Sequence, residues 1–120
     1  MRITDDEGRV WTFHFRQEPN ARGRSFRGHE YHGRTLCNAH LGDCEFAAKE
    51  INLLPCQTTP VARAAAKCSL LDNFVRSVGH KLAFARVINE LFPGSRREAP
   101  ASFAVRKSFW QHYFSIVRSR

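Results

Sequence analysis

Cysteine and histidine residues gather in the middle of the chain with a spacing that could serve a metal ion. The run Cys37-x-x-His40-x-x-x-Cys44 is followed by Cys56 and Cys68. Zinc takes four nitrogen or sulfur ligands in a tetrahedron, and these residues could supply them. However, no CxxC pair occurs, and Cys37 and His40 would point to opposite faces of an alternating strand. The sequence therefore favours no metal and no other cofactor, with zinc as the alternative.

Residues 29–32, His-Glu-Tyr-His, also combine groups that catalyse reactions in other proteins. Their histidines are three apart in a glycine-rich stretch, whereas the helical metalloprotease motif needs a spacing of four. No nucleophile elbow, no phosphate-cradling glycine loop and no Rossmann fingerprint occurs in the sequence. A cysteine–histidine nucleophile needs an orienting third group, which the sequence does not single out. We therefore expect a binding protein and not an enzyme.

Positive charge is the second chemically informative feature. Lysine and arginine total 19 against 11 acidic residues, which gives a formal net charge of +8 and a pI near 10.0. Arginine dominates, and its planar guanidinium suits bidentate contact with phosphate or carboxylate. Such a charge attracts nucleic acid or an acidic protein surface.

The basic candidates for binding fall into two groups. The first lies in residues 17–33, a glycine- and proline-containing stretch predicted to be a loop, where Arg22, Arg24 and Arg27 alternate with glycines and aromatic residues. Such a segment can follow a phosphate backbone and stack bases, although a solvated hairpin loop is the alternative. The second group is predicted on the surface of two C-terminal helices and their linker, at Arg76, His80, Lys81, Arg96, Arg97, Arg106 and Lys107.

The N-terminal half must position the first group, and it is predicted to consist of strands. Residues 34–41 alternate in polarity, as do residues 9–16, and a short strand in residues 2–8 precedes them with a turn at its end. Residues 43–54 allow a short helix or a strand. Residues 60–67 are also open, because a proline at the first turn favours a helix and the position before Cys68 also suits a strand.

Two amphipathic helices are predicted in the C-terminal half. The first spans residues 69–92, begins with a capping box at Ser69 and ends before a Pro-Gly pair. Gly79 in its interior costs about 1 kcal/mol relative to alanine, which indicates the close approach of another element. Its apolar stripe is predicted at Leu71, Phe74, Val78, Leu82, Ala85, Ile88 and Phe92.

The second helix is predicted over residues 100–118, antiparallel to the first because the connection is short. Its apolar face is predicted at Phe103, Trp110, Tyr113, Phe114 and Val117. The expected fold is therefore α+β: one domain over residues 1–120, with an N-terminal antiparallel sheet in residues 1–68 packed against two C-terminal helices. No apolar run of about 18 residues occurs, so no membrane contact is expected. Residues 1–20 contain acids and no apolar signal-peptide region, which favours the cytoplasm and reduced thiols.

The start of the first helix carries the most specific pattern in the chain. It reads Lys67-Cys68-Ser69-x-x-Asp72-Asn73-Phe74-x-Arg76-x-x-Gly79-x-Lys81-x-Ala83-x-x-Arg86. This pattern resembles a group of small accessory proteins of tailed bacteriophages and prophages, as does the later Phe109-Trp110-x-x-Tyr113-Phe114. The resemblance covers residues 61–114 well and residues 9–41 loosely, and the chain departs from it at residues 42–60. At position 80 the group usually has arginine.

The resemblance implies a strand before Cys68 and supplies no catalytic residues. Small phage accessory proteins often block host machinery, including CRISPR nucleases. We therefore expect a non-enzymatic protein that binds a host nucleoprotein complex, or its protein component, in the host bacterial cytoplasm as a counter-defence inhibitor of the anti-CRISPR type. The alternative is a direct DNA- or RNA-binding protein, with or without a structural zinc. The sequence does not indicate the target or the oligomeric state.

Overall fold

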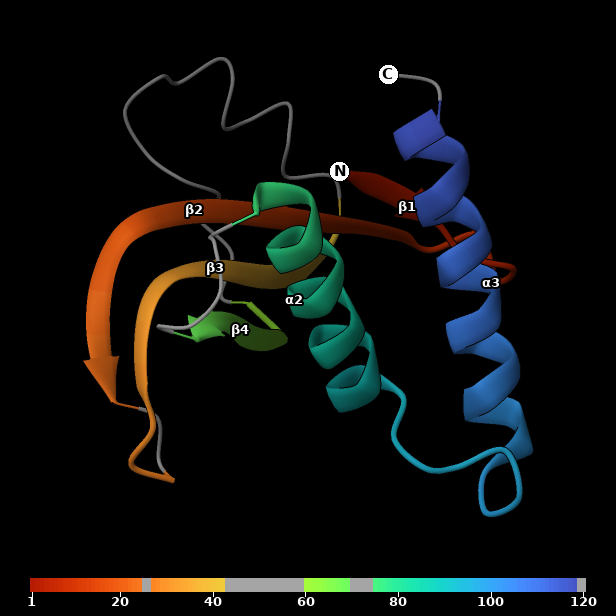
Figure 1. The fold of residues 1–120 in the computed structure, drawn as a ribbon. Coiled ribbons are helices and arrows are strands. Elements are labelled where there is room, and N and C mark those ends of the chain that lie inside the picture. The colour runs from red at the N-terminus through yellow and green to blue at the C-terminus, as the bar shows by residue number, and fades with distance from the viewer. Residues whose placement is uncertain (25–26, 43–59, 70–74, 119–120) are drawn as a thin grey trace.

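The computed structural model describes residues 1–24, 27–42, 60–69 and 75–118, which form a sheet followed by two helices. The four strands are antiparallel and lie in sequence order, and both helices pack on one face of the sheet (Figure 1). The elements are β1 (Arg2–Thr4), β2 (Val10–Arg24), β3 (Glu30–Leu41), β4 (Ala62–Ser69), α2 (Arg76–Leu91) and α3 (Pro100–Arg118). The predicted α+β architecture is thus confirmed. Within the described ranges, no helix is long and apolar enough to cross a membrane.

The hairpin of β2 and β3 is longer than the sequence indicates. Residues 17–33 were expected to be a loop, but β2 continues to Arg24 and β3 begins at Glu30. Two irregularities allow this length: the register with β3 shifts between Glu18 and Arg22, and the register with β4 shifts between Tyr31 and Arg34. Bulges of this kind accommodate proline and glycine inside a strand and bend it. In Figure 1 the two strands curl strongly at this end, on the side away from α3.

Strand β4 resolves the segment that the sequence left open. Residues 62–69 pair with β3, so the alanine-rich stretch is a strand, as the phage resemblance implies, and not a helix. Ser69 is still paired with Tyr31, and the predicted capping box at Ser69 is therefore wrong. Helix α2 begins only at Arg76, after Val75 with an extended backbone. Residues 43–54, whose structure was also left open, lie outside the described residues.

The predicted apolar stripe of α2 agrees with the structure at Ile88, which is buried, but not at Val78 and Leu82. Leu71 and Phe74 of that stripe lie outside the described residues. Val78 and Leu82 are 54% and 46% exposed, whereas Phe84 and its neighbours on the helix are fully buried. The cause is Gly79, because a β-carbon built at this position would overlap the hydroxyl of Thr35 on β3. The predicted close approach at Gly79 is confirmed. It rotates the helix so that Gly79, which has no side chain, faces the sheet. The buried residues of α2 are Ala83, Phe84, Val87 and Ile88.

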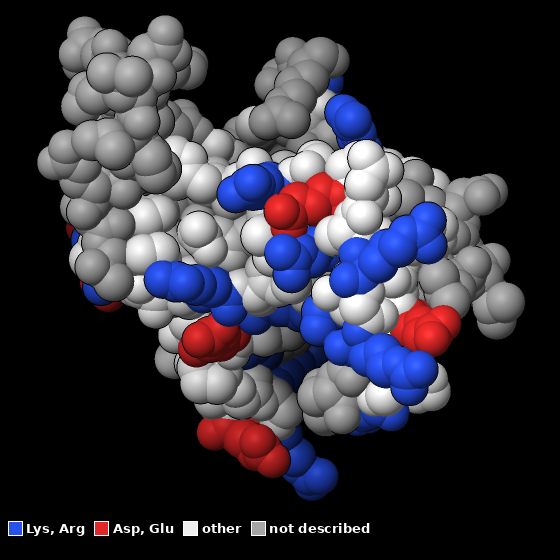
Figure 2. All heavy atoms as spheres, turned by 90° about the vertical axis from the view of Figure 1, so that its left-hand side faces the viewer, with Lys and Arg blue, Asp and Glu red and all other residues white. Residues whose placement is uncertain are grey.

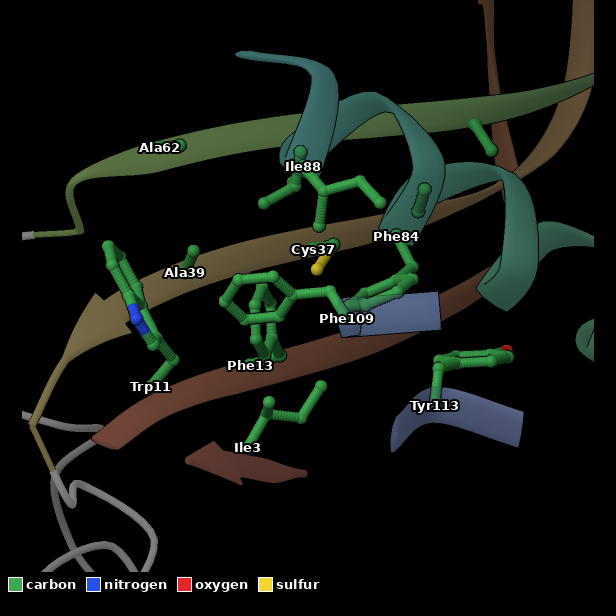
Figure 3. Close-up of a cluster of buried hydrophobic side chains, with 13 residues drawn as sticks. Ile3, Trp11, Phe13, Cys37, Ala39, Ala62, Phe84, Ile88, Phe109 and Tyr113 are labelled. Carbon is green, nitrogen blue, oxygen red and sulfur yellow. The ribbon is translucent and has the colours of Figure 1, made fainter. Parts of the chain in front are cut away.

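Aromatic rings from three elements form the core between the sheet and the helices (Figure 3). Phe13 of β2 contacts Phe84 of α2 and Phe109 of α3 edge to face, with ring centroids 5.1 and 6.0 Å apart. Such geometry matches the negative face of one ring with the positive edge of another. The predicted apolar face of α3 is correct at Tyr113, but Phe109 is its other buried residue. Three residues assigned to that face remain 36–40% exposed: Phe103, Phe114 and Val117.

Candidate nucleic-acid interface

Among the metal ligands suggested by spacing, Cys37 and His40 do not come together in the part of the chain that the structure describes. Cys37 is fully buried on the helix-covered face of β3, whereas His40 lies on the opposite face, with its ring centroid 5.2 Å from that of His14. Burial raises the pKa of Cys37 to about 12, so its sulfur remains a protonated thiol. Cys68 Sγ lies 4.0 Å from His32 Nε2. Among the residues that the structure describes, no three His, Cys, Asp or Glu side chains are grouped to hold a metal ion, and Cys44 and Cys56 lie outside them.

Several basic residues of the helical group make structural contacts. Arg106 donates hydrogen bonds to the carbonyl oxygens of Phe92 and Gly94, which would otherwise lack partners at the end of α2. The guanidinium groups of Arg96 and Arg106 lie 5.7 and 5.9 Å from the ring centroid of Phe103. Lys81 Nζ lies 5.3 Å from the ring of Phe114. The exposed basic residues of this group are Arg76, Arg97 and Lys107, together with Lys81 and Arg96.

His80 was expected on an exposed helix face, and the structure corrects this. Its ring stacks on Phe15 of β2 with centroids 3.4 Å apart, and its Nδ1 lies 2.9 Å from the Tyr113 hydroxyl of α3. The position follows from the rotation of α2 about Gly79, which turns the next residue toward the sheet. The half-buried His80 therefore connects β2, α2 and α3.

The sheet face opposite the helices carries a second set of cations. Directly paired residues on neighbouring strands share a face. Arg34 pairs with Lys67, Asn38 with Arg63, and Leu36 with Arg16, all in the register that places Cys37 on the helix side. The basic sheet face therefore consists of Arg16, Arg34, Arg63 and Lys67.

The curled end of the hairpin carries a second group of cations. We call residues 19–24 and 27–33 the hairpin arm; it holds Arg22, Arg24 and Arg27, all of which are exposed. Figure 2 shows the molecule from the side of the hairpin arm, where several groups of blue side chains lie on the described surface with fewer red ones among them. Arg22 pairs with His32 and Arg24 with Glu30, so these two arginines lie on the other face of the ribbon from the Gly23–Tyr31 pair between them.

Two glutamates partly balance these cations. Glu18 Oε1 accepts a hydrogen bond from Arg34 Nε at 2.5 Å, and Arg24 lies 3.3 Å from Glu30. The bond to Glu18 is the largest cause that raises the pKa of Arg34, so this guanidinium keeps its charge. Glu18 and Glu30 are the acidic residues between positions 16 and 34, where five arginines stand. The surface therefore retains a positive balance.

The cations of the basic sheet face lie on three strands that are far apart in the sequence. The signal that could have found them is the alternation of Arg63, Ala65 and Lys67, which places two cations on one face once residues 62–69 are known to be a strand. The alanine-rich composition of this segment favours a helix, so the alternation by itself does not indicate a strand.

Comparisons with known proteins add no further assignment. A scan against models of protein families, a search of curated proteins and a search of solved structures each found no significant match.

Proposed function

We propose that this chain is a non-enzymatic protein that binds nucleic acid directly, through the basic sheet face and the hairpin arm. The observation that carries the proposal is the convergence of cations from β2, β3 and β4 on the sheet face opposite the helices. Arginine makes up most of this set, and its fork of donors matches the geometry of a phosphate.

The curvature of the hairpin strengthens this interpretation. A twisted two-stranded ribbon with basic side chains can follow a nucleic-acid groove or strand, as other proteins that recognise nucleic acids with strands do. Contacts of this kind position the protein on the backbone and carry little sequence information. We therefore expect binding that depends strongly on salt and weakly on base sequence.

A salt series measures this interface. Fluorescence anisotropy with labelled oligonucleotides should show binding that weakens linearly with salt on logarithmic axes, with a slope of about −0.7 to −0.9 for each phosphate neutralised. The double substitution Arg63→Gln/Lys67→Gln should reduce that slope by about 1.4 to 1.8, because two phosphate contacts are lost.

The matched control is Arg97→Gln/Lys107→Gln, which removes the same charge from the linker and α3, where both side chains are exposed. It should leave the slope nearly unchanged. Equal losses for the two double variants would contradict the assignment of the interface, and no binding even at low salt would contradict the proposed function.

A second candidate is the counter-defence role that the phage resemblance implies, in which the chain binds the protein component of a host nucleic-acid-handling complex. It is favoured by the apolar residues Val75, Val78 and Leu82, which are 46–54% exposed along α2 beside the basic residues Arg76 and Lys81. Apolar patches rimmed by charge are typical of protein-binding surfaces.

Plaque assays test this candidate. Expression of the chain in a bacterium with active CRISPR immunity should restore plaques of the targeted phage, and Val78→Glu/Leu82→Glu should abolish the rescue. Ser77→Glu, an exposed change on the same helix, is the control and should retain it. Absence of rescue by the unmodified chain would contradict inhibition of that system.

A further inference from the structure

We infer that Tyr31 is a stacking platform for an unpaired base, so that the preferred ligand is single-stranded nucleic acid. This inference rests on the proposed function and specifies its ligand. It starts from the position of Tyr31 in the hairpin arm, where the ring is half-buried among basic residues.

The ring of Tyr31 is held against the backbone of the neighbouring strand. Tyr31 pairs with Gly23 of β2, and a β-carbon built on Gly23 would lie 2.8 Å from the tyrosine hydroxyl and 3.1 Å from two ring carbons. The absence of a side chain at position 23 therefore makes the space that the ring occupies. A tyrosine that is fixed in this way loses little conformational entropy when a base stacks on it.

Cations surround the ring. Lys67 Nζ of β4 lies 5.1 Å from its centroid, within the range of a cation–π contact. Arg34 of β3 pairs directly with Lys67, so the two cations are neighbours on the same face of the sheet. Both cations belong to the basic sheet face, so a base on the ring would lie next to groups that bind its own phosphates.

Space for such a base is present beside the ring. An open depression of about 300 Å³ is lined by Arg22, Gly23, Arg24, Glu30 and Tyr31. This volume is at the lower end of the range for small-ligand sites. Two arginines and a glutamate at its rim offer donors and an acceptor for base edges and phosphates.

An aromatic ring surrounded by cations favours single-stranded nucleic acid over a duplex as the ligand. In a duplex the bases are paired and stacked inside the helix, so an aromatic ring on a protein surface does not reach their faces. A basic groove with an aromatic ring is the arrangement by which proteins hold single strands, and it tolerates any base because every base has a π face. The chemistry is shared by DNA and RNA.

The test compares single-stranded and duplex oligonucleotides of equal length, using dT15, rU15 and a 15-base-pair DNA. The unmodified protein should prefer the single strands. Tyr31→Ala should weaken single-strand binding about five- to 150-fold and change duplex binding less than about twofold. Tyr31→Phe, which keeps the ring but loses the hydroxyl, should retain most of the single-strand affinity.

A direct signature of stacking accompanies the affinities. An oligonucleotide with one 2-aminopurine should lose fluorescence when it binds the unmodified protein or Tyr31→Phe, and should lose much less with Tyr31→Ala. Circular dichroism and urea unfolding of each variant establish that the fold is retained.

The outcomes separate the two proposals. Equal affinity for single strands and duplex, with no dependence on Tyr31, would overturn this inference while the proposed function stands. No binding to any oligonucleotide would overturn both.

Discussion

At the scale of single residues, Asp5 organises the first turn of the chain. Its carboxylate accepts hydrogen bonds from the backbone amides of Glu7 and Arg9, from Arg9 Nε and from Trp11 Nε1, at 2.8–3.0 Å. Its side chain is only 8% exposed. Desolvation alone would raise the pKa of Asp5, but these four hydrogen bonds together outweigh it and hold the pKa below its ordinary value.

The lowered pKa predicts how stability depends on pH. A carboxyl group with a lower pKa in the folded state stabilises the fold fully above its unfolded pKa of about 3.9, and this contribution is lost as the pH falls through the folded value. Asp5→Asn should therefore reduce the free energy of unfolding by about 1–3 kcal/mol at pH 7, with a smaller deficit near pH 3. Urea unfolding at both values measures this.

Asp6→Asn is the control for Asp5, because Asp6 is an exposed neighbour of the same charge. It should change stability little at either pH. A deficit in Asp5→Asn that stayed constant between the two values would show that the loss does not arise from the charged carboxylate.

At the scale of elements, the contact between Gly79 and Thr35 sets the position of α2 on the sheet. Thr35 is fully buried, and its hydroxyl donates a hydrogen bond to Gln17 Oε1 at 2.9 Å. Small residues surround this contact, since Ala64 and Ala66 of β4 share the same face of the sheet. The helix can therefore approach closely, and this approach turns His80 inward and leaves Val78 exposed.

Substitution of Gly79 tests this packing. Helix propensity alone would make Gly79→Ala favourable by about 1 kcal/mol. Overlap with the stiff side chain of Thr35 should reverse the sign and give a net loss of about 1–3 kcal/mol in the free energy of unfolding. In a Thr35→Ala background, which removes the hydroxyl, the loss should shrink by at least about 1 kcal/mol.

Ser77→Ala provides the reference for helix propensity, because residue 77 is exposed on the same helix. Denaturant unfolding of Gly79→Ala, Thr35→Ala and the double variant completes a double-mutant cycle. Additive effects of Gly79→Ala and Thr35→Ala would show that the two side chains do not meet.

At the scale of the whole molecule, the sheet separates packing from charge. One face of the sheet holds the aromatic core under α2 and α3. The other is the basic sheet face, with Arg16, Arg34, Arg63 and Lys67. Phe109 joins the parts of the core, with ring centroids 6.1, 6.0 and 5.3 Å from those of Trp11, Phe13 and Phe92. The sheet face opposite the helices can carry polar side chains because the apolar core is concentrated on the helix side.

Phe109→Ala should therefore lower the free energy of unfolding by about 3–5 kcal/mol, a large fraction of the total for one domain. Phe103→Ala is the matched control on the same helix, where the ring is 36% exposed, and it should cost much less. Thermal and urea unfolding measure both. Similar losses at the two positions would contradict the assignment of Phe109 to the core; failure of Phe109→Ala alone to fold would agree with it.

The local pattern of polar and apolar residues predicts an element correctly where burial of one face determines its structure. The alternation of Trp11, Phe13 and Phe15 correctly predicted a strand over residues 9–16, the first part of β2, and Pro93-Gly94 marked the end of α2. The pattern did not predict which side of a helix is buried where two elements pack against each other. The stripe through Val78 and Leu82 is apolar and helical, yet it is exposed because only the sheet reveals which side of α2 carries the smallest residue.

The sequence by itself determined the class of fold, the net positive charge and the group of Arg22, Arg24 and Arg27. The net charge follows from composition alone. The class of fold follows from the alternation of polar and apolar residues over a few neighbouring positions. Tertiary structure alone decided that residues 17–24 and 30–33 belong to paired strands, and that the half-buried His80 packs against Phe15 and Tyr113. It also brought Tyr31 beside Lys67 and Arg34. The physical reason is that strand pairing satisfies backbone hydrogen bonds between segments far apart in the chain, and the register of that pairing chooses which side chains meet.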